Sequence, residues 1–199
     1  MENTRTKTTR NSLILLLTAA IWGMAFVSQS KGMDYMHPFT FNGVRSLIGA
    51  ASILVYILIS RKIAGDKAAP LDWKLNVKAG LLCGIFLTIA STLQQFGIKY
   101  TSVGKAGFIT TLYIIFVPMF GIFLKKKVAP VVWAAAVMAA VGMYLLCMTE
   151  SLRLGAGDIM VFLCAIAFAI QIMTVDHYAA RIDGAVVSCI QFTVCGVVC

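Results

Sequence analysis

Charged side chains are scarce in this chain: Asp, Glu, Lys and Arg together make up 13% of the residues, whereas hydrophobic residues make up 60%. Long stretches carry no charge at all, and they span residues 11–30, 79–98, 106–124, 128–149 and 159–175. A further stretch, 35–60, is interrupted only by Arg45, and another runs from 184 to 199. A helix that crosses a bilayer needs about 20 mostly apolar residues. This pattern excludes a soluble globular domain and predicts an all-α, polytopic transmembrane helix bundle.

Acidic residues and histidines are rarer still, at 8 and 2. The acids lie at the ends of the apolar runs or between them, so no carboxylate pair is expected at membrane depth. An intramembrane enzyme would need such a pair, a nucleophile with its base or a metal cluster. The chain has no GxS motif, no HExxH motif and no CxxC pair among its 6 cysteines. We therefore expect no enzyme activity, no metal, no cofactor and no disulfide.

The formal net charge of +9 is a feature that nucleic-acid-binding proteins share. Here, however, the basic residues lie in short segments between apolar runs rather than on one polar face. This distribution argues against a nucleic-acid partner and indicates the lipid bilayer instead.

We place transmembrane spans at about residues 12–30, 39–60, 75–97, 104–124, 130–148 and 157–178, with a seventh, 185–199, that the chain end cuts short. If the N-terminus is cytoplasmic, the inner segments hold 12 Lys and Arg residues and the outer ones hold 4. Inner loops of membrane proteins are enriched in Lys and Arg. The sequence therefore predicts a multi-pass protein of the cytoplasmic membrane with its N-terminus inside. The first span has the basic start of a signal peptide, but it continues to Ser30 without a small-residue cleavage site, which indicates a retained helix.

Prolines and one acid mark predicted helix positions. Pro38 and Pro130 fall at helix starts, where a missing N–H is harmless. Asp158 falls in the first turn of the sixth span, where a carboxylate suits the helix dipole. Pro118 lies inside the fourth span, where it is expected to kink the helix.

The first and sixth spans show a weak internal echo. Aligning Trp22 with Phe168 also aligns Ser28 with Thr174 and Arg45 with Gln191, although identities are almost absent. An odd number of helices between two copies inverts the second copy, and inverted repeats around a central site are common in transporters. The alternative is that two ordinary apolar helices share similar flanks.

The first span contains the segment AAIWGMAFVSQSKGM and the second HPFTFNGVRSLIGA, residues Tyr100–Leu124 read YTSVGKAGFITTLYIIFVPMFGIFL, the fifth span ends in GMYLLCM and the sixth contains GDIMVFLCAIAFAIQIM. These segments resemble the EamA family of the drug/metabolite transporter superfamily. The resemblance implies a first five-helix repeat over residues 1–150 and the start of a second, inverted repeat over 157–199. It also implies transport of metabolites or amino acids, often outward.

The sequence departs from that family in two places. The chain stops inside the seventh span, so about three helices of the family fold are expected from a missing C-terminal half or from another chain, such as a second copy in a homodimer. The fourth span ends in Lys125, Lys126 and Lys127, where many relatives have a turn similar to Gly-Glu-Arg. No carboxylate lies within the first span, where small multidrug relatives carry a proton-coupling glutamate, which argues against that coupling in this half.

Polar residues inside the spans are the candidates for substrate contact, because they are costly in lipid. In the third span Gly84, Thr88, Ser91, Thr92 and Gln95 recur at three- and four-residue steps, and the fourth span carries a similar stripe of small residues. These stripes could line a solute path, or they could let helices pack closely. The predicted substrate-binding residues are Trp22, Gln29, Arg45, Thr88, Gln94, Gln95, Lys105, Thr111, Tyr113 and Gln171.

Arg45 is the strongest single candidate because its charge is fixed. It could extend to the lipid headgroups, or it could face the bundle and require an anionic or carbonyl partner. Together with Gln29, Gln94, Gln95 and Lys105 it falls in the outer half of the predicted bundle. These residues suggest a basic outer vestibule that favours a carboxylate or phosphate, while ordinary solvated loop charges are the alternative.

From these patterns we predict a transporter that moves small metabolites, such as amino acids or related organic solutes, by alternating access between inverted repeats. The alternative is a non-transporting membrane subunit or an inactive fragment. The adjacent Asp176 and His177 could relay protons, although a solvated pair at the membrane interface is the more common arrangement.

Overall fold

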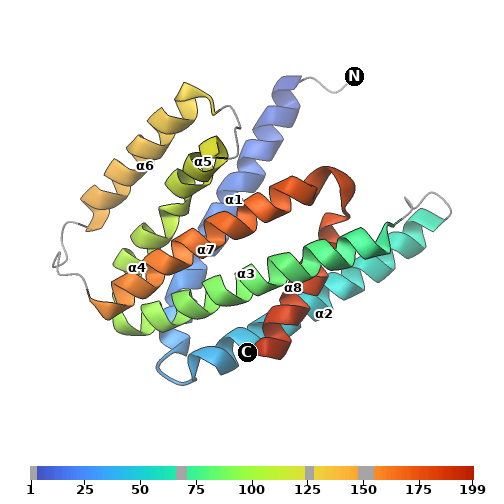
Figure 1. Cartoon of the computed structure of the whole chain (residues 1–199), viewed down its shortest axis with the longest axis horizontal. Coiled ribbons are helices and arrows are strands. Elements are labelled where there is room, and N and C mark those ends of the chain that lie inside the picture. Colours follow the sequence, from blue (N-terminus) through green and yellow to red (C-terminus); the bar gives the residue numbers. More distant parts are fainter. Residues whose placement is uncertain (1–3, 66–70, 124–127, 148–154) are drawn as a thin grey trace.

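The computed structural model describes residues 4–65, 71–123, 128–147 and 155–199, and in these ranges the regular structure is helical throughout. Figure 1 shows the helices as a bundle. In chain order they are α1 (Thr4–Gly32), α2 (Pro38–Ala64), α3 (Trp73–Tyr100), α4 (Val103–Thr111), α5 (Tyr113–Phe123), α6 (Pro130–Cys147), α7 (Ala156–Tyr178) and α8 (Gly184–Val198), with a short 3-10 helix, Ala179–Arg181, before α8. The predicted all-α bundle is confirmed.

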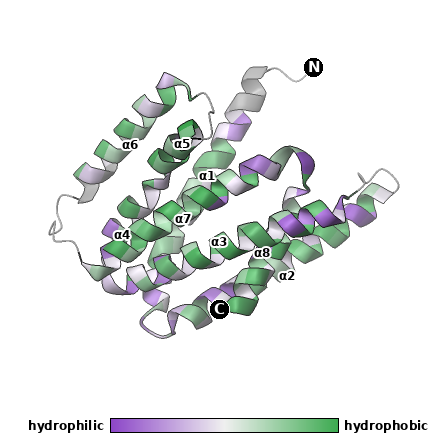
Figure 2. Ribbon diagram, viewed as in Figure 1, coloured by the Kyte–Doolittle hydropathy of each residue, from purple (hydrophilic) through white to green (hydrophobic). Residues whose placement is uncertain are grey.

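Within the described residues, five helical segments are long and apolar enough to cross a membrane. They are Thr9–Gly32, Pro38–Ala64, Trp73–Tyr100, Val103–Phe123 and Ala156–Arg181, while α6 and α8 are shorter apolar helices. Hydrophobic residues cover most of each helix, and many large ones are exposed, as on α1 from Leu13 to Leu17 (Figure 2). Exposed apolar surface on this scale is expected only where lipid replaces water. The chain is a multi-pass membrane protein.

Side-chain caps and prolines define the helix starts. Asp72 accepts a hydrogen bond from the Leu75 backbone N–H at 3.1 Å, and Ser102 accepts one from Lys105 at 3.2 Å. Asp183 accepts from the N–H groups of Ala185 and Val186 at 3.0 and 3.3 Å. These caps satisfy N–H groups that have no partner within the helix. The predicted proline positions are confirmed, because α2 begins at Pro38 and α6 at Pro130.

Helix α3 lies at the centre of the bundle. It packs against α7 on one side and α8 on the other, while α2 packs against α8, and α4 and α5 pack against α7 (Figure 1). Glycines permit the close approach of α8: a Cβ on Gly80 would lie 2.7 Å from Ile190, and one on Gly84 would lie 2.8 Å from Val194. Small residues at such crossings are typical of membrane bundles.

The bundle has two distinct ends. The basic end, at which α1, α3 and α8 begin and α2, α5 and α7 finish, carries Arg61, Lys62, Lys74, Lys78 and Arg181 (Figure 1). At the opposite end α1 and α3 finish and α4 and α7 begin. There Phe26 of α1 and Val161 of α7 both belong to a cluster around Ile98, so α1 and α7 run in opposite directions.

The predicted fourth span is present but divided. The break falls at Leu112, between α4 and α5, six residues before the proline that was expected to kink the helix. Pro118 cannot donate to the carbonyl of Ile114, and its ring crowds that carbonyl, so the preceding turn must adjust. The break itself lies earlier in the chain, where the Leu112 N–H donates to the Ile109 carbonyl at 3.2 Å, the tighter spacing of a 3-10 turn.

Two sequence predictions fall outside the described residues. The Lys125–Lys127 turn lies in one of the gaps, and so does the boundary between the predicted repeats at 148–154. The inverted repeat itself stays a prediction.

Candidate functional site

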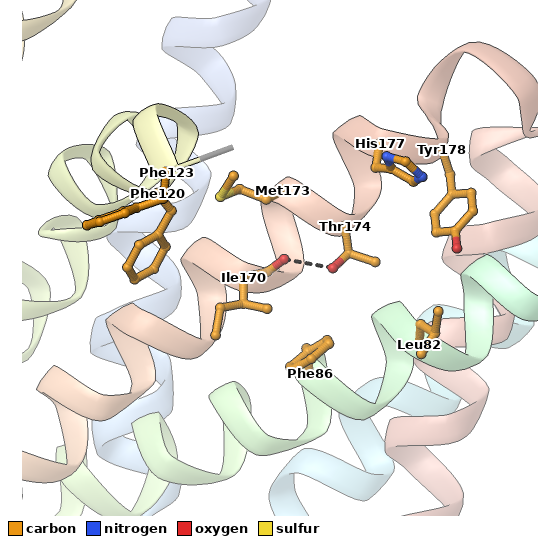
Figure 3. Close-up of a pocket in the computed structure, with 9 residues that line it drawn as sticks. All are labelled: Leu82, Phe86, Phe120, Phe123, Ile170, Met173, Thr174, His177 and Tyr178. Carbon is orange, nitrogen blue, oxygen red and sulfur yellow. Dashed lines mark hydrogen bonds between the residues drawn. The ribbon is translucent and has the colours of Figure 1, made fainter. Parts of the chain in front are cut away.

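A cavity of about 570 Å³ lies between α3, α5 and α7 in the half of the bundle nearest the basic end (Figure 3). Its walls come from three helices far apart in the sequence. The lining residues are Leu82, Phe86, Phe120, Phe123, Ile170, Met173, Thr174, His177 and Tyr178.

The cavity exists because α5 does not continue alongside α3 as α4 does. At the opposite end α4 contacts α3, where Ala106 is buried against Ile98. Beyond the break at Leu112, α5 packs instead against α6 and α7. On α7, Ile170, Thr174 and Tyr178 recur every fourth residue and therefore share one face. The space between this face, α5 and α3 stays open.

Aromatic and aliphatic side chains form the depth of the cavity. Phe120 stacks on Phe116, with ring centres 6.1 Å apart, and Phe116 meets Phe162 edge-on at 5.5 Å. These contacts hold the α5 wall against α7. Polar groups are confined to α7, where the Thr174 hydroxyl donates to the Ile170 carbonyl at 2.8 Å (Figure 3).

At the end of α7 the cavity is lined by His177 and Tyr178, whose rings meet edge-on at 4.8 Å. Asp176 instead borders a second cavity of about 360 Å³ between α5, α6 and α7. Adjacent residues of a helix point in different directions, so the side chains of Asp176 and His177 border different cavities.

The opposite end of the bundle is closed by a polar cluster around Asp158. This carboxylate is 4% exposed and accepts a hydrogen bond from the Gly155 backbone N–H at 2.9 Å. It also accepts one from the Thr101 hydroxyl at the end of α3. The Lys105 ammonium of α4 lies 3.8 Å from it. The cluster ties α3, α4 and α7 together at one point.

Close backbone packing reinforces that closure. A Cβ on Gly97 would lie 2.4 Å from Val161 and 3.0 Å from the Gly157 carbonyl. A Cβ on Gly157 would lie 2.8 Å from the carbonyl carbon of Tyr100. No larger side chain fits this crossing without displacement, so α3 and α7 are in direct contact there.

The structure brings several predicted site residues together near this closed end. Gln95 is fully buried and donates from Nε2 to the Gln29 carbonyl at 3.4 Å. Gln94 donates to the Thr110 hydroxyl at 3.3 Å. The Oε1 atoms of Gln29 and Gln95 are buried and have no hydrogen-bond partner in the described part of the chain. Lys105 belongs to the Asp158 cluster.

Arg45 lies apart on α2, at an exposed position between the buried residues Asn42 and Ser46. Its guanidinium donates to the Asn42 side chain at 3.0 Å and lies 5.7 Å from the centre of the Phe41 ring. Asn42 in turn donates to the Ser91 carbonyl at 3.0 Å. Within the described ranges no carboxylate side chain forms an ion pair with Arg45, so it anchors to an amide and a ring.

The remaining predicted residues make local or interhelical contacts. Thr88 and Thr111 donate to carbonyls of their own helices, those of Gly84 and Phe108, each at 2.7 Å. Gln171 donates to Gln191 of α8 at 3.1 Å. Trp22 is 54% exposed, and Tyr113 is half-buried.

None of the ten predicted residues lines the cavity between α3, α5 and α7. Sequence reasoning searched for polar side chains, whereas this cavity is walled by Leu, Phe, Ile and Met, which occur along every span. The only available signal was the polar face of α7 formed by Thr174, His177 and Tyr178. Among the described residues no group of three or more His, Cys, Asp or Glu could hold a metal ion.

Comparison with known proteins gives a consistent result. Residues 10–148 match the EamA-like transporter family. An uncharacterized transporter of Archaeoglobus fulgidus is 31% identical over 171 residues, which cover 83% of this chain and 48% of that protein. The chain thus spans about half the length of this curated relative. No solved structure matches the chain.

Proposed function

Because the chain belongs to the EamA-like transporter family, we propose that it moves small organic solutes, such as amino acids and related metabolites, across the cytoplasmic membrane by alternating access. The observation that carries this proposal is the asymmetry of the bundle. A cavity lies in the half nearest the basic end, while the other end is held shut by the Asp158 cluster and by Gly97 against Gly157. A site accessible from one side at a time is the basis of alternating access.

The proposed orientation places the basic end in the cytoplasm. Described residues at that end include Arg61, Lys62, Lys74, Lys78 and Arg181, and inner segments of membrane proteins are enriched in Lys and Arg. Reporter tags at the N-terminus and in the 124–127 turn are expected on the same, cytoplasmic, side. Tags on opposite sides would contradict this orientation.

We further propose that additional helices complete the solute path, supplied by a second copy or by another segment that forms an inverted counterpart. The support is the bare surface of the first helices: none of the apolar window of α1 is buried and only 17% of that of α2. Arg45 on α2, which pairs with no carboxylate side chain among the described residues, would find its anionic partner there.

Uptake into proteoliposomes tests the proposal. Purified chain reconstituted at a defined ratio should take up at least one labelled solute from a panel of amino acids and related metabolites, saturably and above protein-free liposomes. If the panel gives no uptake, either alone or with a complementary half, the alternative function of a non-transporting membrane subunit is supported instead.

A further inference from the structure

The cavity between α3, α5 and α7 is widely open to the outside of the bundle, and its lining is apolar except for Thr174, His177 and Tyr178 of α7. None of the nine residues that line it is Asp, Glu, Lys or Arg. Its walls include the rings of Phe86, Phe120 and Phe123 (Figure 3). A volume of about 570 Å³ falls within the range of about 300–1,000 Å³ typical of small-molecule sites.

The mouth lies where positive charge gathers. Lys78 precedes Leu82 by one helical turn, and side chains four residues apart lie on the same face of a helix. Lys78 is exposed, and its neighbour Ala79 belongs to a buried cluster on which Tyr178 of the cavity packs. Arg181 follows in the short 3-10 helix after α7. Lys78 and Arg181 therefore lie at the same end of the bundle as His177, although neither of them lines the cavity.

This distribution of charge selects among ligands. An apolar body gains free energy on leaving water for the aromatic walls. A charged group is costly to bury without a partner, so it must stay at the mouth. There Lys78, one helical turn from Leu82, favours a carboxylate over an ammonium group.

On the premise of the function proposed above, we propose that this cavity binds small amphipathic carboxylates. The aromatic or branched apolar body lies between Phe86 of α3 and Phe120 of α5, and the carboxylate lies at the mouth beside Lys78 and His177. The residues of α3 and α7 that line the cavity would then determine which ligands bind. The polar residues around Asp158 lie at the opposite end of the bundle and take no part in this binding.

Equilibrium binding of radiolabelled 3-phenylpropionate to the purified chain in phosphatidylcholine nanodiscs tests this site. Leu82→Trp fills the cavity from α3, and we expect it to weaken binding at least tenfold. Leu81→Trp, at the neighbouring position that is 46% exposed on the outer surface, is the matched control and should stay within about twofold of the parent.

A second pair of variants guards against a folding defect in the first. Met173→Trp fills the cavity from α7 and should also weaken binding at least tenfold, while Leu163→Trp, at a position that is 47% exposed on the same helix, should not. Equal affinity in the filled and control variants would overturn the proposal. That result would assign the cavity to a lipid chain or to a further helix.

The charge at the mouth is tested separately. Lys78→Gln should weaken 3-phenylpropionate binding about threefold, as expected for a partly exposed charge pair. The affinity of uncharged 3-phenyl-1-propanol, measured by its competition with the radiolabelled ligand, should stay unchanged in this variant. Lys62→Gln, which removes a charge from α2 at the same end, should alter neither.

The outcomes separate this inference from the function on which it rests. If the parent chain shows no saturable 3-phenylpropionate binding but still transports other solutes, the proposed ligand class is wrong and transport stands. If 3-phenylpropionate binds at the cavity but no solute is transported, the ligand class is supported and the proposed function is contradicted.

Discussion

Asp158 is the residue on which the closed end depends most. Its carboxylate is nearly buried and receives hydrogen bonds from the Gly155 backbone and the Thr101 hydroxyl, with the Lys105 ammonium 3.8 Å away. A buried carboxylate is stable only when such partners replace its hydration. The sequence placed Asp158 correctly in the first turn of a helix. It gave no indication that Lys105 and Thr101, more than fifty positions earlier, would meet it.

Replacing Asp158 with Asn should destabilise the bundle by about 1–3 kcal/mol, because a buried acceptor and a charge partner are lost together. The apparent unfolding temperature in detergent micelles would measure the change. Asp34→Asn, at an exposed position near the same end, serves as the control and should have little effect. If Lys105→Gln lowers the unfolding temperature as much in the Asp158→Asn background as in the parent, the Lys105–Asp158 ion pair contributes nothing to stability.

Gly97 should tolerate no side chain. A Cβ there would lie 2.4 Å from Val161, and forcing α3 and α7 apart should cost about 1–3 kcal/mol in the free energy of unfolding. Gly107→Ala is the matched control, since a Cβ at Gly107 meets nothing within 4 Å. The same thermal assay would contradict this packing if the two variants proved equally stable.

The polar stripe on α3 shows what a sequence can and cannot predict about a site. Its spacing predicted a common face, on which Gly84, Thr88, Ser91 and Gln95 are buried and Thr92 is half-buried, while a role in a solute path stays a prediction. It could not reveal which neighbours they face: Gly84 meets Val194, and Ser91 contacts Cys195, both on α8. The cavity between α3, α5 and α7 could not be predicted, because in the sequence its apolar lining residues cannot be told from residues that face lipid.

At the scale of helices, hydropathy predicted the spans closely because the cost of exposing backbone to lipid leaves few alternatives. The second span, predicted at 39–60, is observed as Pro38–Ala64, and the sixth, predicted at 157–178, as Ala156–Tyr178. The helix ends were less predictable. Helix α1 begins at Thr4 rather than near residue 12, since hydrogen bonding continues beyond the apolar segment.

The break between α4 and α5 shapes the cavity, and Pro118 is its proposed cause. Pro118→Ala restores a backbone donor, so α5 should straighten at the break, and a change of about 20° should move Ile122, which lies about 15 Å beyond the break, by about 5 Å. Spin labels at Leu81 and Ile122, both on the exposed surface, would report the distance between α3 and α5.

Pro130→Ala is the control for that experiment, because a proline at a helix start removes no helical hydrogen bond. It should leave the distance between the two labels unchanged. If Pro118→Ala also leaves it unchanged, the break at Leu112 arises from packing against α6 and α7 rather than from the proline.

At the scale of the whole molecule, the two ends of the bundle differ in charge and in closure. The basic end adjoins the cavity, while the opposite end is joined by one polar cluster and one glycine crossing. Composition and charge patterning predicted the bundle and its basic end. The central position of α3 depends on contacts between distant helices, and no local pattern in the sequence encodes it.

The central claim is that transport requires the Asp158 end to open. A chain carrying Thr101→Cys and Asp158→Cys, with its native cysteines replaced, allows that end to be locked by oxidation, because the two native side chains are in direct contact. After reconstitution, oxidant should abolish solute uptake and reductant should restore it. Undiminished uptake by the fully cross-linked protein would contradict the account.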